Sequence, residues 1–129
     1  MRPLLAALAL LGATFACNGS SSSSASLPAV IHDLQQSILA GDVSAMQRMC
    51  ASGARADCER LIQQIRGAES EAGTRLDQVI SINFDLARGA QRVEGTVTGS
   101  DARGSELFSA TVAVEQRGDG GPWRIVAIH

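Results

Sequence analysis

The chain has 129 residues, of which 19% are charged, and its formal net charge at pH 7 is −2. All of its basic residues are arginines, and they are scattered among carboxylates, which excludes the clustered basic surface of a nucleic-acid-binding protein. Aromatic residues make up only 3% of the chain and tyrosine is absent, so few large side chains are available to build a core or a site.

The N-terminus has the organisation of an export signal. Arg2 precedes an apolar run over residues 4–13, and Ala16 stands directly before Cys17. The run is too short to span a bilayer, and a basic start, a short apolar stretch and a small residue before the cut are typical of a cleaved signal peptide. With a cysteine directly after the cut and a serine tract at residues 20–24, the segment resembles a bacterial lipoprotein signal.

That resemblance implies a signal peptide over residues 1–16 and a lipid, such as palmitate, on Cys17. Residues 17–27 would then form a polar tether. Asn18 rather than aspartate follows the cysteine, which by resemblance to proteobacterial lipoproteins implies anchoring to the outer membrane, with the domain in the periplasm. The alternative is an ordinary signal peptide cut at the same bond, which leaves Cys17 as a free thiol.

Lipidation of Cys17 leaves two other cysteines, Cys50 and Cys58. In an oxidising compartment two such thiols can pair. The turn between them contains Gly53 and joins two predicted helices, so it can bring the two Cα atoms within bridging range. We expect a structural disulfide. A redox-active pair is the alternative, although this spacing lacks the compact Cys-x-x-Cys geometry.

Residues 28–129 suffice for one domain, and their first half has helical periodicity. Serine or aspartate at each start and glycine at each end predict three helices. Their limits are Ser26 and Gly41, Asp42 and Gly53, and Asp57 and Gly67. The predicted inward residues are Leu27, Val30, Ile31, Leu34 and Ile38 in the first helix, Val43, Met46, Met49 and Cys50 in the second, and Cys58, Leu61, Ile62 and Ile65 in the third.

From Leu76 the apolar period changes to two, which predicts four strands joined by short turns. In the first strand, Ile80, Ile82, Phe84 and Leu86 alternate with Ser81, Asn83 and Asp85, so we expect the former set to be buried and the latter exposed. In the second, Gly95 and Gly99 share the parity of Val93 and Val97 and permit strong bending.

The third predicted strand has Phe108, Ala110, Val112 and Val114 on one face. The fourth, residues 123–128, is apolar on both parities, so it is predicted to be central or covered on both faces, with Trp123 in the core. The fold class is therefore α+β, with three N-terminal helices packed on a curved four-stranded antiparallel sheet.

Two short motifs resemble nuclear-transport-factor-2-like domains, the superfamily that includes ketosteroid isomerases and polyketide cyclases. Residues 38–46, Ile-Leu-Ala-Gly-Asp-Val-Ser-Ala-Met, are similar to the helix–Gly-Asp–helix opening of this family, and residues 121–126, Gly-Pro-Trp-Arg-Ile-Val, are similar to its closing strand. The resemblance covers residues 28–129. It implies a sheet wrapped around the helices, with a cone-shaped pocket between them.

No catalytic motif accompanies this expected fold. His32 lies on a helix flank and His129 is the final residue, where precise positioning of a general base is difficult. Asp77 and Asp85 are the only strand carboxylates that an isomerase-like enzyme of this family could use, and neither falls on the apolar parity. The two histidines are too far apart to make a credible zinc set, so we predict no catalytic residues, no metal and no cofactor.

Two functions remain open at this stage. The first is a non-enzymatic envelope lipoprotein that binds a partner protein or a small ligand in the periplasm. One form of it is an immunity protein that inhibits a secreted toxin. The second is a small isomerase or cyclase of the same superfamily. We expect no nucleic-acid partner, and contact with the membrane only through the lipid.

Lipidation of Cys17 can be tested in cells. Growth with an alkyne fatty acid should label the wild-type protein and not Cys17→Ser, because only the cysteine sulfur can accept the lipid. Equal labelling of the two proteins would contradict the lipoprotein interpretation.

Overall fold

The computed structural model describes residues 26–85, 89–118 and 120–129. The predicted signal peptide, Cys17, most of the tether and Leu86 lie outside the described residues. The elements in chain order are α2 (Leu27–Ala40), α3 (Val43–Met49), the short 3-10 helix η2 (Ser52–Ala54), α4 (Arg55–Ala72), β2 (Gln78–Ile82), β3 (Arg92–Ser100), β4 (Glu106–Gln116) and β5 (Trp123–Ile128).

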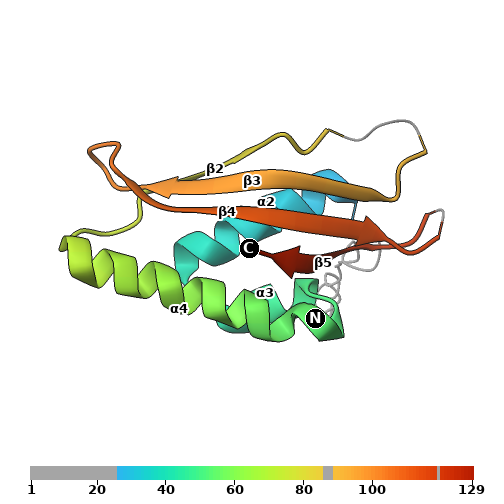
Figure 1. Ribbon diagram of the computed structural model, residues 1–129, viewed down its shortest axis with the longest axis horizontal. Coiled ribbons are helices and arrows are strands. Elements are labelled where there is room, and N and C mark those ends of the chain that lie inside the picture. Colours follow the sequence, from blue (N-terminus) through green and yellow to red (C-terminus); the bar gives the residue numbers. More distant parts are fainter. Residues whose placement is uncertain (1–25, 86–88, 119) are drawn as a thin grey trace, which may run out of the picture.

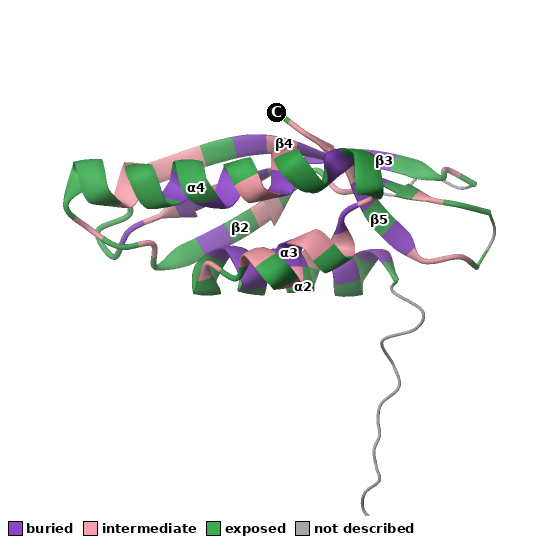
Figure 2. Cartoon of the chain, turned by 90° about the horizontal axis from the view of Figure 1, so that it is seen from below, coloured by how far each residue is buried: buried purple, intermediate pink, exposed green. Residues whose placement is uncertain are grey.

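The four strands form one antiparallel sheet in the order β2-β3-β4-β5, and the three α-helices lie on one face of it (Figure 1). The predicted α+β architecture is therefore confirmed. Figure 2, seen from the helical side, shows buried residues recurring along the helices and strands between these two layers.

The first helix begins and ends where its sequence predicts. The Ser26 hydroxyl accepts a hydrogen bond from the Ala29 amide at 3.3 Å, and Gly41 ends the helix in the left-handed conformation with φ of 65°. Asp42 then caps α3, because its carboxylate accepts from the Ala45 amide at 3.0 Å. The buried residues of α2 are Leu27, Val30, Leu34, Ser37 and Ile38.

The predicted limits of the other two helices need correction. α3 ends at Met49 rather than at Gly53, since Cys50 is already extended and pairs with β5. α4 begins at Arg55, so Asp57 is not its cap but lies in its first turn. α4 also continues through the exposed Gly67 to Ala72, because one exposed glycine costs a helix only about 1 kcal/mol and Gly73 supplies the left-handed terminus.

Strand β2 presents the opposite face from the one predicted. Val79 is buried and Ser81 faces inward, while Ile80 and Ile82 are 45% and 49% exposed. The register explains this reversal: Val79 lies opposite Gly99 and Ser81 opposite Val97, both on the inner face of β3.

The alternation fails at the end of this strand. Asn83 has φ of 65°, a conformation that asparagine tolerates better than most residues. This residue breaks the period of two, so Phe84 turns inward and packs against the core although it shares sequence parity with Ile82. Asp85 is exposed, as predicted.

The two glycines of β3 make room for aromatic rings. A Cβ atom at Gly95 would lie 2.5 Å from the Phe84 ring and 2.7 Å from the Ile82 carbonyl oxygen. At Gly99, a Cβ atom would collide with the ring of Phe108. The ladder also has an irregularity between Gly99 and Ser100, in agreement with the predicted bend.

The core between the layers is apolar, and Trp123 belongs to it with 5% of its surface exposed. β5 is an edge strand rather than a central one, but its outer edge is partly hydrogen-bonded. The Ala51 amide donates to the Ile125 carbonyl at 2.8 Å, and Cys50 forms a parallel bridge with Ile125.

The inward residues of the third predicted strand, β4, are placed as expected: Ala110, Val112 and Val114 are buried, and Phe108 packs against the core.

Two glycine substitutions should shift stability in opposite directions. Gly95→Ala should lower the free energy of unfolding by about 1–3 kcal/mol, because the added methyl group meets a ring and a backbone carbonyl. Gly67→Ala should raise it by about 0.5–1 kcal/mol, because a Cβ atom there meets nothing within 4 Å and alanine favours the helix. Denaturant unfolding of the two variants checks both signs, and a stable Gly95→Ala would contradict the tight packing.

Candidate functional site

The titratable residues considered for catalysis lie on the surface. His32, His129, Asp77 and Asp85 are all exposed, and none of them points into the layer between sheet and helices. The carboxylate that is buried, Asp101, accepts hydrogen bonds from the Arg103 and Ser105 amides at 2.9 Å and so holds the β3–β4 turn. Within the described residues, no group of three or more His, Cys, Asp or Glu side chains could hold a metal ion.

The interior of the expected cone is occupied by apolar side chains from both layers. Leu34, Met46 and Ile62 from the helices and Val97 and Val112 from the sheet are each at most 1% exposed. These side chains therefore form a packed core between the layers rather than a polar reaction chamber.

Cys50 and Cys58 are joined by a disulfide, with their Cα atoms 6.9 Å apart. Both side chains are fully buried. The bond ties the residue that follows α3 to the first turn of α4, and Cys50 also contacts β5 through its backbone bridge. Burial and attachment to three elements suit the structural role predicted for this pair.

The face of the sheet that the helices leave uncovered exposes two large aliphatic side chains, Ile80 and Ile82. Antiparallel partners share a face, so the register places Ile80 beside Thr98 and Ser109, and Ile82 beside Thr96 and Thr111. We call these six residues the outer patch. None of them is charged, and the helices lie on the opposite side of the sheet (Figure 1).

Charged residues lie at both ends of this face, with Glu106 opposite Ser100 at one end and a group of paired charges at the other. The Arg92 guanidinium donates to Glu115 at 2.6 Å and to Glu94 at 3.1 Å. These hydrogen bonds, that to Glu115 first, raise the pKa of Arg92 above its usual value. Arg124 lies opposite Glu115 on β5. The outer patch is therefore an uncharged area between two charged ends of the outer face.

The outer patch was not predicted, because the apolar alternation within β2 alone indicates the opposite orientation of Ile80 and Ile82. A signal was available in β3, where Gly95, Val97 and Gly99 fix the inner parity and leave Thr96 and Thr98 outside. Their neighbours on β2 must then also face outward.

No helix in the described part of the chain is long and apolar enough to cross a membrane. No family model matches the sequence, and no curated protein matches it. A solved structure does: a calcium/calmodulin-dependent protein kinase type II association domain from Thiobacillus denitrificans, with a TM-score of 0.53 and 14% identity, over 84% of this chain and 96% of that one. At this identity the likeness shows the fold alone: three helices packed against a four-stranded antiparallel sheet, an arrangement consistent with a nuclear-transport-factor-2-like fold.

The disulfide can be tested by mass spectrometry without reductant. The mass of the domain should then be lower than that of the dithiol form by two hydrogen atoms. Replacing Cys50 and Cys58 together by alanine should cost about 2–3 kcal/mol of stability in the chain-entropy model. Alkylation of two free thiols without a reductant would contradict the assignment.

Proposed function

We propose that this protein is a non-enzymatic envelope lipoprotein that binds a partner protein in the periplasm through the outer patch. The observation that carries the proposal is the orientation of β2, which exposes Ile80 and Ile82. An export signal with a cysteine at its cut site supports the location.

The orientation of β2 is unfavourable in an isolated domain. Two isoleucines face water, and the hydroxyl of Ser81 is buried without a hydrogen-bond partner among the described residues. Both features lower the stability of the domain. Burying the aliphatic surface would have stabilised it by about 25 cal/mol for each Å² removed from water, and a buried hydroxyl without a hydrogen bond costs about 1–3 kcal/mol. Local rules are broken in this way mainly at functional sites, and covering the two isoleucines with a partner would recover part of the loss.

The position of β2 favours a protein as the partner. β2 is an edge strand, and an edge with exposed β-branched side chains is a surface on which other chains pack or pair. Interface cores are depleted in charge, as the outer patch is. Small ligands are usually bound in a concavity that surrounds them, whereas the outer patch lies on one face of a sheet.

The surroundings of the candidate acids support binding over the isomerase or cyclase alternative. Such an enzyme would need a carboxylate inside the layer between sheet and helices, yet Asp77 and Asp85 are exposed and the buried Asp101 is engaged in a turn. The resembling structure is named as an association domain, a description compatible with a non-enzymatic role. A more specific form of this function is that of an immunity protein against a secreted toxin. A toxin gene next to the gene for this protein would support it.

Three variants distinguish binding through the outer patch from nonspecific binding to exposed apolar side chains. Ile80→Thr with Ile82→Thr keeps β-branched residues in β2 but removes the aliphatic surface, so the domain should keep its melting temperature. Leu39→Gln is the matched control, because Leu39 is an exposed large aliphatic residue on the helical side. Thr98→Arg places a charge at the centre of the patch.

The measurement is recovery of a stoichiometric partner by the tagged, oxidised domain from the native envelope. Wild type and Leu39→Gln should retain the partner, while the double variant and Thr98→Arg should lose at least tenfold in affinity, which corresponds to about 1.4 kcal/mol. Equal retention by all four proteins would reject the outer patch. Sedimentation of the purified domain distinguishes a different protein from a second copy of this chain.

A further inference from the structure

Strand β2 and the residue after it combine three unfavourable features. Ile80 and Ile82 expose 45% and 49% of their surface. The hydroxyl of Ser81, between them, is buried and has no hydrogen-bond partner among the described residues. Asn83 has φ of 65° and is the one non-glycine residue with positive φ in the described part of the chain. Their proximity points to a common cause, the register of β2 against β3.

This register changes by one residue at Asn83. Ser81 lies opposite Val97, so the same register would place residue 83 opposite Gly95. Instead, the ring of Phe84 lies against Gly95, where an added Cβ atom would be 2.5 Å from it. The chain therefore contains one extra residue relative to β3 between Ser81 and Phe84. Asn83 is that residue, and its left-handed conformation is found in one class of β-bulge.

A second register needs no extra residue at Asn83. If the bulge moves to the connection between α4 and β2, the strand slides by one residue along β3. Ile80 then lies opposite Gly99. Ile82 lies opposite Val97, so both isoleucines face the core. Because side chains alternate along a strand, a slip of one residue exchanges its inner and outer sets.

Each register has its own cost. The shifted register brings Ser81 to the surface, where water can satisfy its hydroxyl, and Asn83 adopts ordinary extended backbone. Phe84 keeps its place against Gly95. However, two isoleucines must fit where the smaller Val79 and Ser81 side chains lie in the observed register, and overpacking a core is unfavourable. Opposing costs of this kind bring the two states closer in free energy than either cost alone would.

We propose that β2 exchanges between these two registers, and that the outer patch is complete in only one of them. In the observed register Ile80 and Ile82 lie on the uncovered face of the sheet, while in the shifted register they lie in the core. The exchange hides the apolar surface when no partner covers it. This consequence rests on the proposed function: a partner that binds the isoleucines stabilises the observed register by its difference in affinity for the two states.

The backbone hydrogen bonds distinguish the two registers. The Thr111 amide donates to the His129 carbonyl at 2.7 Å and the His129 amide donates back at 2.9 Å, so Thr111 is turned toward β5. Thr96, opposite Thr111, is then turned toward β2. In the observed register Thr96 lies opposite Ile82. The amides of Ile82 and, two residues earlier, Ile80 therefore bind β3.

In the observed register the amides of Val79 and Ser81 point to the open edge of the sheet, because hydrogen bonding alternates along an antiparallel strand. In the shifted register the roles are exchanged. The amides of Ser81 and Asn83 bind β3, and those of Ile80 and Ile82 point to the open edge. The set of slowly exchanging amides therefore identifies the register without any partner.

The test is amide hydrogen exchange, followed by NMR, on three variants of the purified, oxidised protein. Asn83→Gly favours the observed register because glycine adopts positive φ without strain. Ser81→Val favours the same register, since it removes the unsatisfied hydroxyl and adds apolar surface on the inner face. Asn83→Val is the matched opposite, because a β-branched residue disfavours positive φ and prefers extended backbone.

In Asn83→Gly and Ser81→Val, the amides at positions 80 and 82 should exchange at least about tenfold more slowly than those at 79 and 81. In Asn83→Val the order should reverse, with slow exchange at positions 81 and 83. In the wild type both sets should have intermediate rates, because each spends part of the time at the open edge. Partner recovery should be lower for Asn83→Val than for Asn83→Gly.

Three results would overturn the exchange. The first is slow exchange at Ile80 and Ile82 in Asn83→Val. The second is fast exchange at all four positions, 79–82, while the Val97 amide in the centre of the sheet stays slow, which would mean that β2 only frays. The third is wild-type rates equal to those of Asn83→Gly or Asn83→Val. Reversal of the slow amides with equal partner recovery by the two Asn83 variants would leave the exchange standing and count against the proposed function alone.

Discussion

The helical layer is fastened to the sheet at Cys50, and much of the remaining arrangement depends on that junction. The residue ends α3, is bonded through sulfur to α4 and pairs through its backbone with β5. Because the adjacent Ala51 amide bonds to Ile125, the segment covers one edge of the sheet. At the opposite edge, β2, the hydrogen bond found in the described part of the chain comes from the Gln35 side chain, which donates to the Val79 carbonyl at 3.2 Å. The two edges are therefore unequal, and the functional proposal concerns the one with the lighter cover.

The sequence predicted most of the architecture because the relevant signals are local. Ser26 and Asp42 determine helix starts through hydrogen bonds three residues away, and Gly41 determines a helix end through its own backbone angle. In the sequence, the glycines of β3 likewise indicated a bend. That Gly95 and Gly99 leave space for the rings of Phe84 and Phe108 could be seen only in the structure. Local hydrogen bonds and backbone preferences of this kind can be read from a single sequence.

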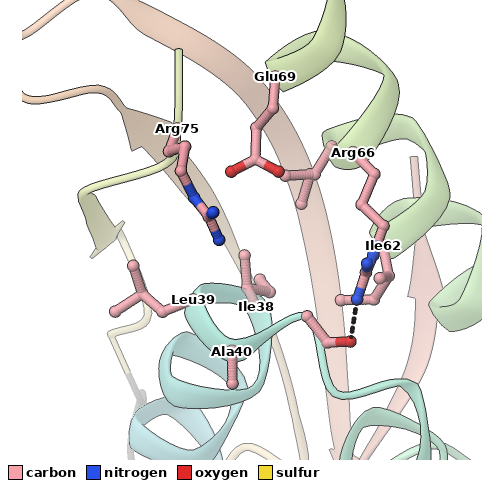
Figure 3. A pocket seen from close by; sticks show the side chains of 9 residues that line it. Ile38, Leu39, Ala40, Ile62, Arg66, Glu69 and Arg75 are labelled. Atoms are coloured by element: carbon pink, nitrogen blue, oxygen red, sulfur yellow. Dashed lines mark hydrogen bonds between the residues drawn. The ribbon is translucent and has the colours of Figure 1, made fainter.

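The errors arose where tertiary contacts outweighed local pattern. Gly67 looked like a helix end, but α4 continues to Ala72, because Glu69 beyond that glycine accepts a hydrogen bond from the Leu76 amide and Gly73 supplies the left-handed terminus. The face of β2 is determined by pairing with β3 and by one residue, Asn83, so its own alternation misled the prediction. The pocket where the end of α2 meets α4 (Figure 3) could not be predicted either, since the hydrogen bond from the Arg66 guanidinium to the Gly41 carbonyl joins residues that are far apart in the sequence.

The antiparallel order of the strands also has a consequence for the sequence of events in which this chain can fold. Each strand pairs with its neighbour in sequence, and the disulfide joins residues only eight positions apart, so these loops close at small entropic cost. The bridge between Cys50 and Ile125 spans 75 positions (125 − 50) and must wait for the last strand. In an oxidising environment the disulfide between α3 and α4 can therefore form before β5 has joined the sheet. The covalent link is then in place when the sheet edge arrives to dock against it.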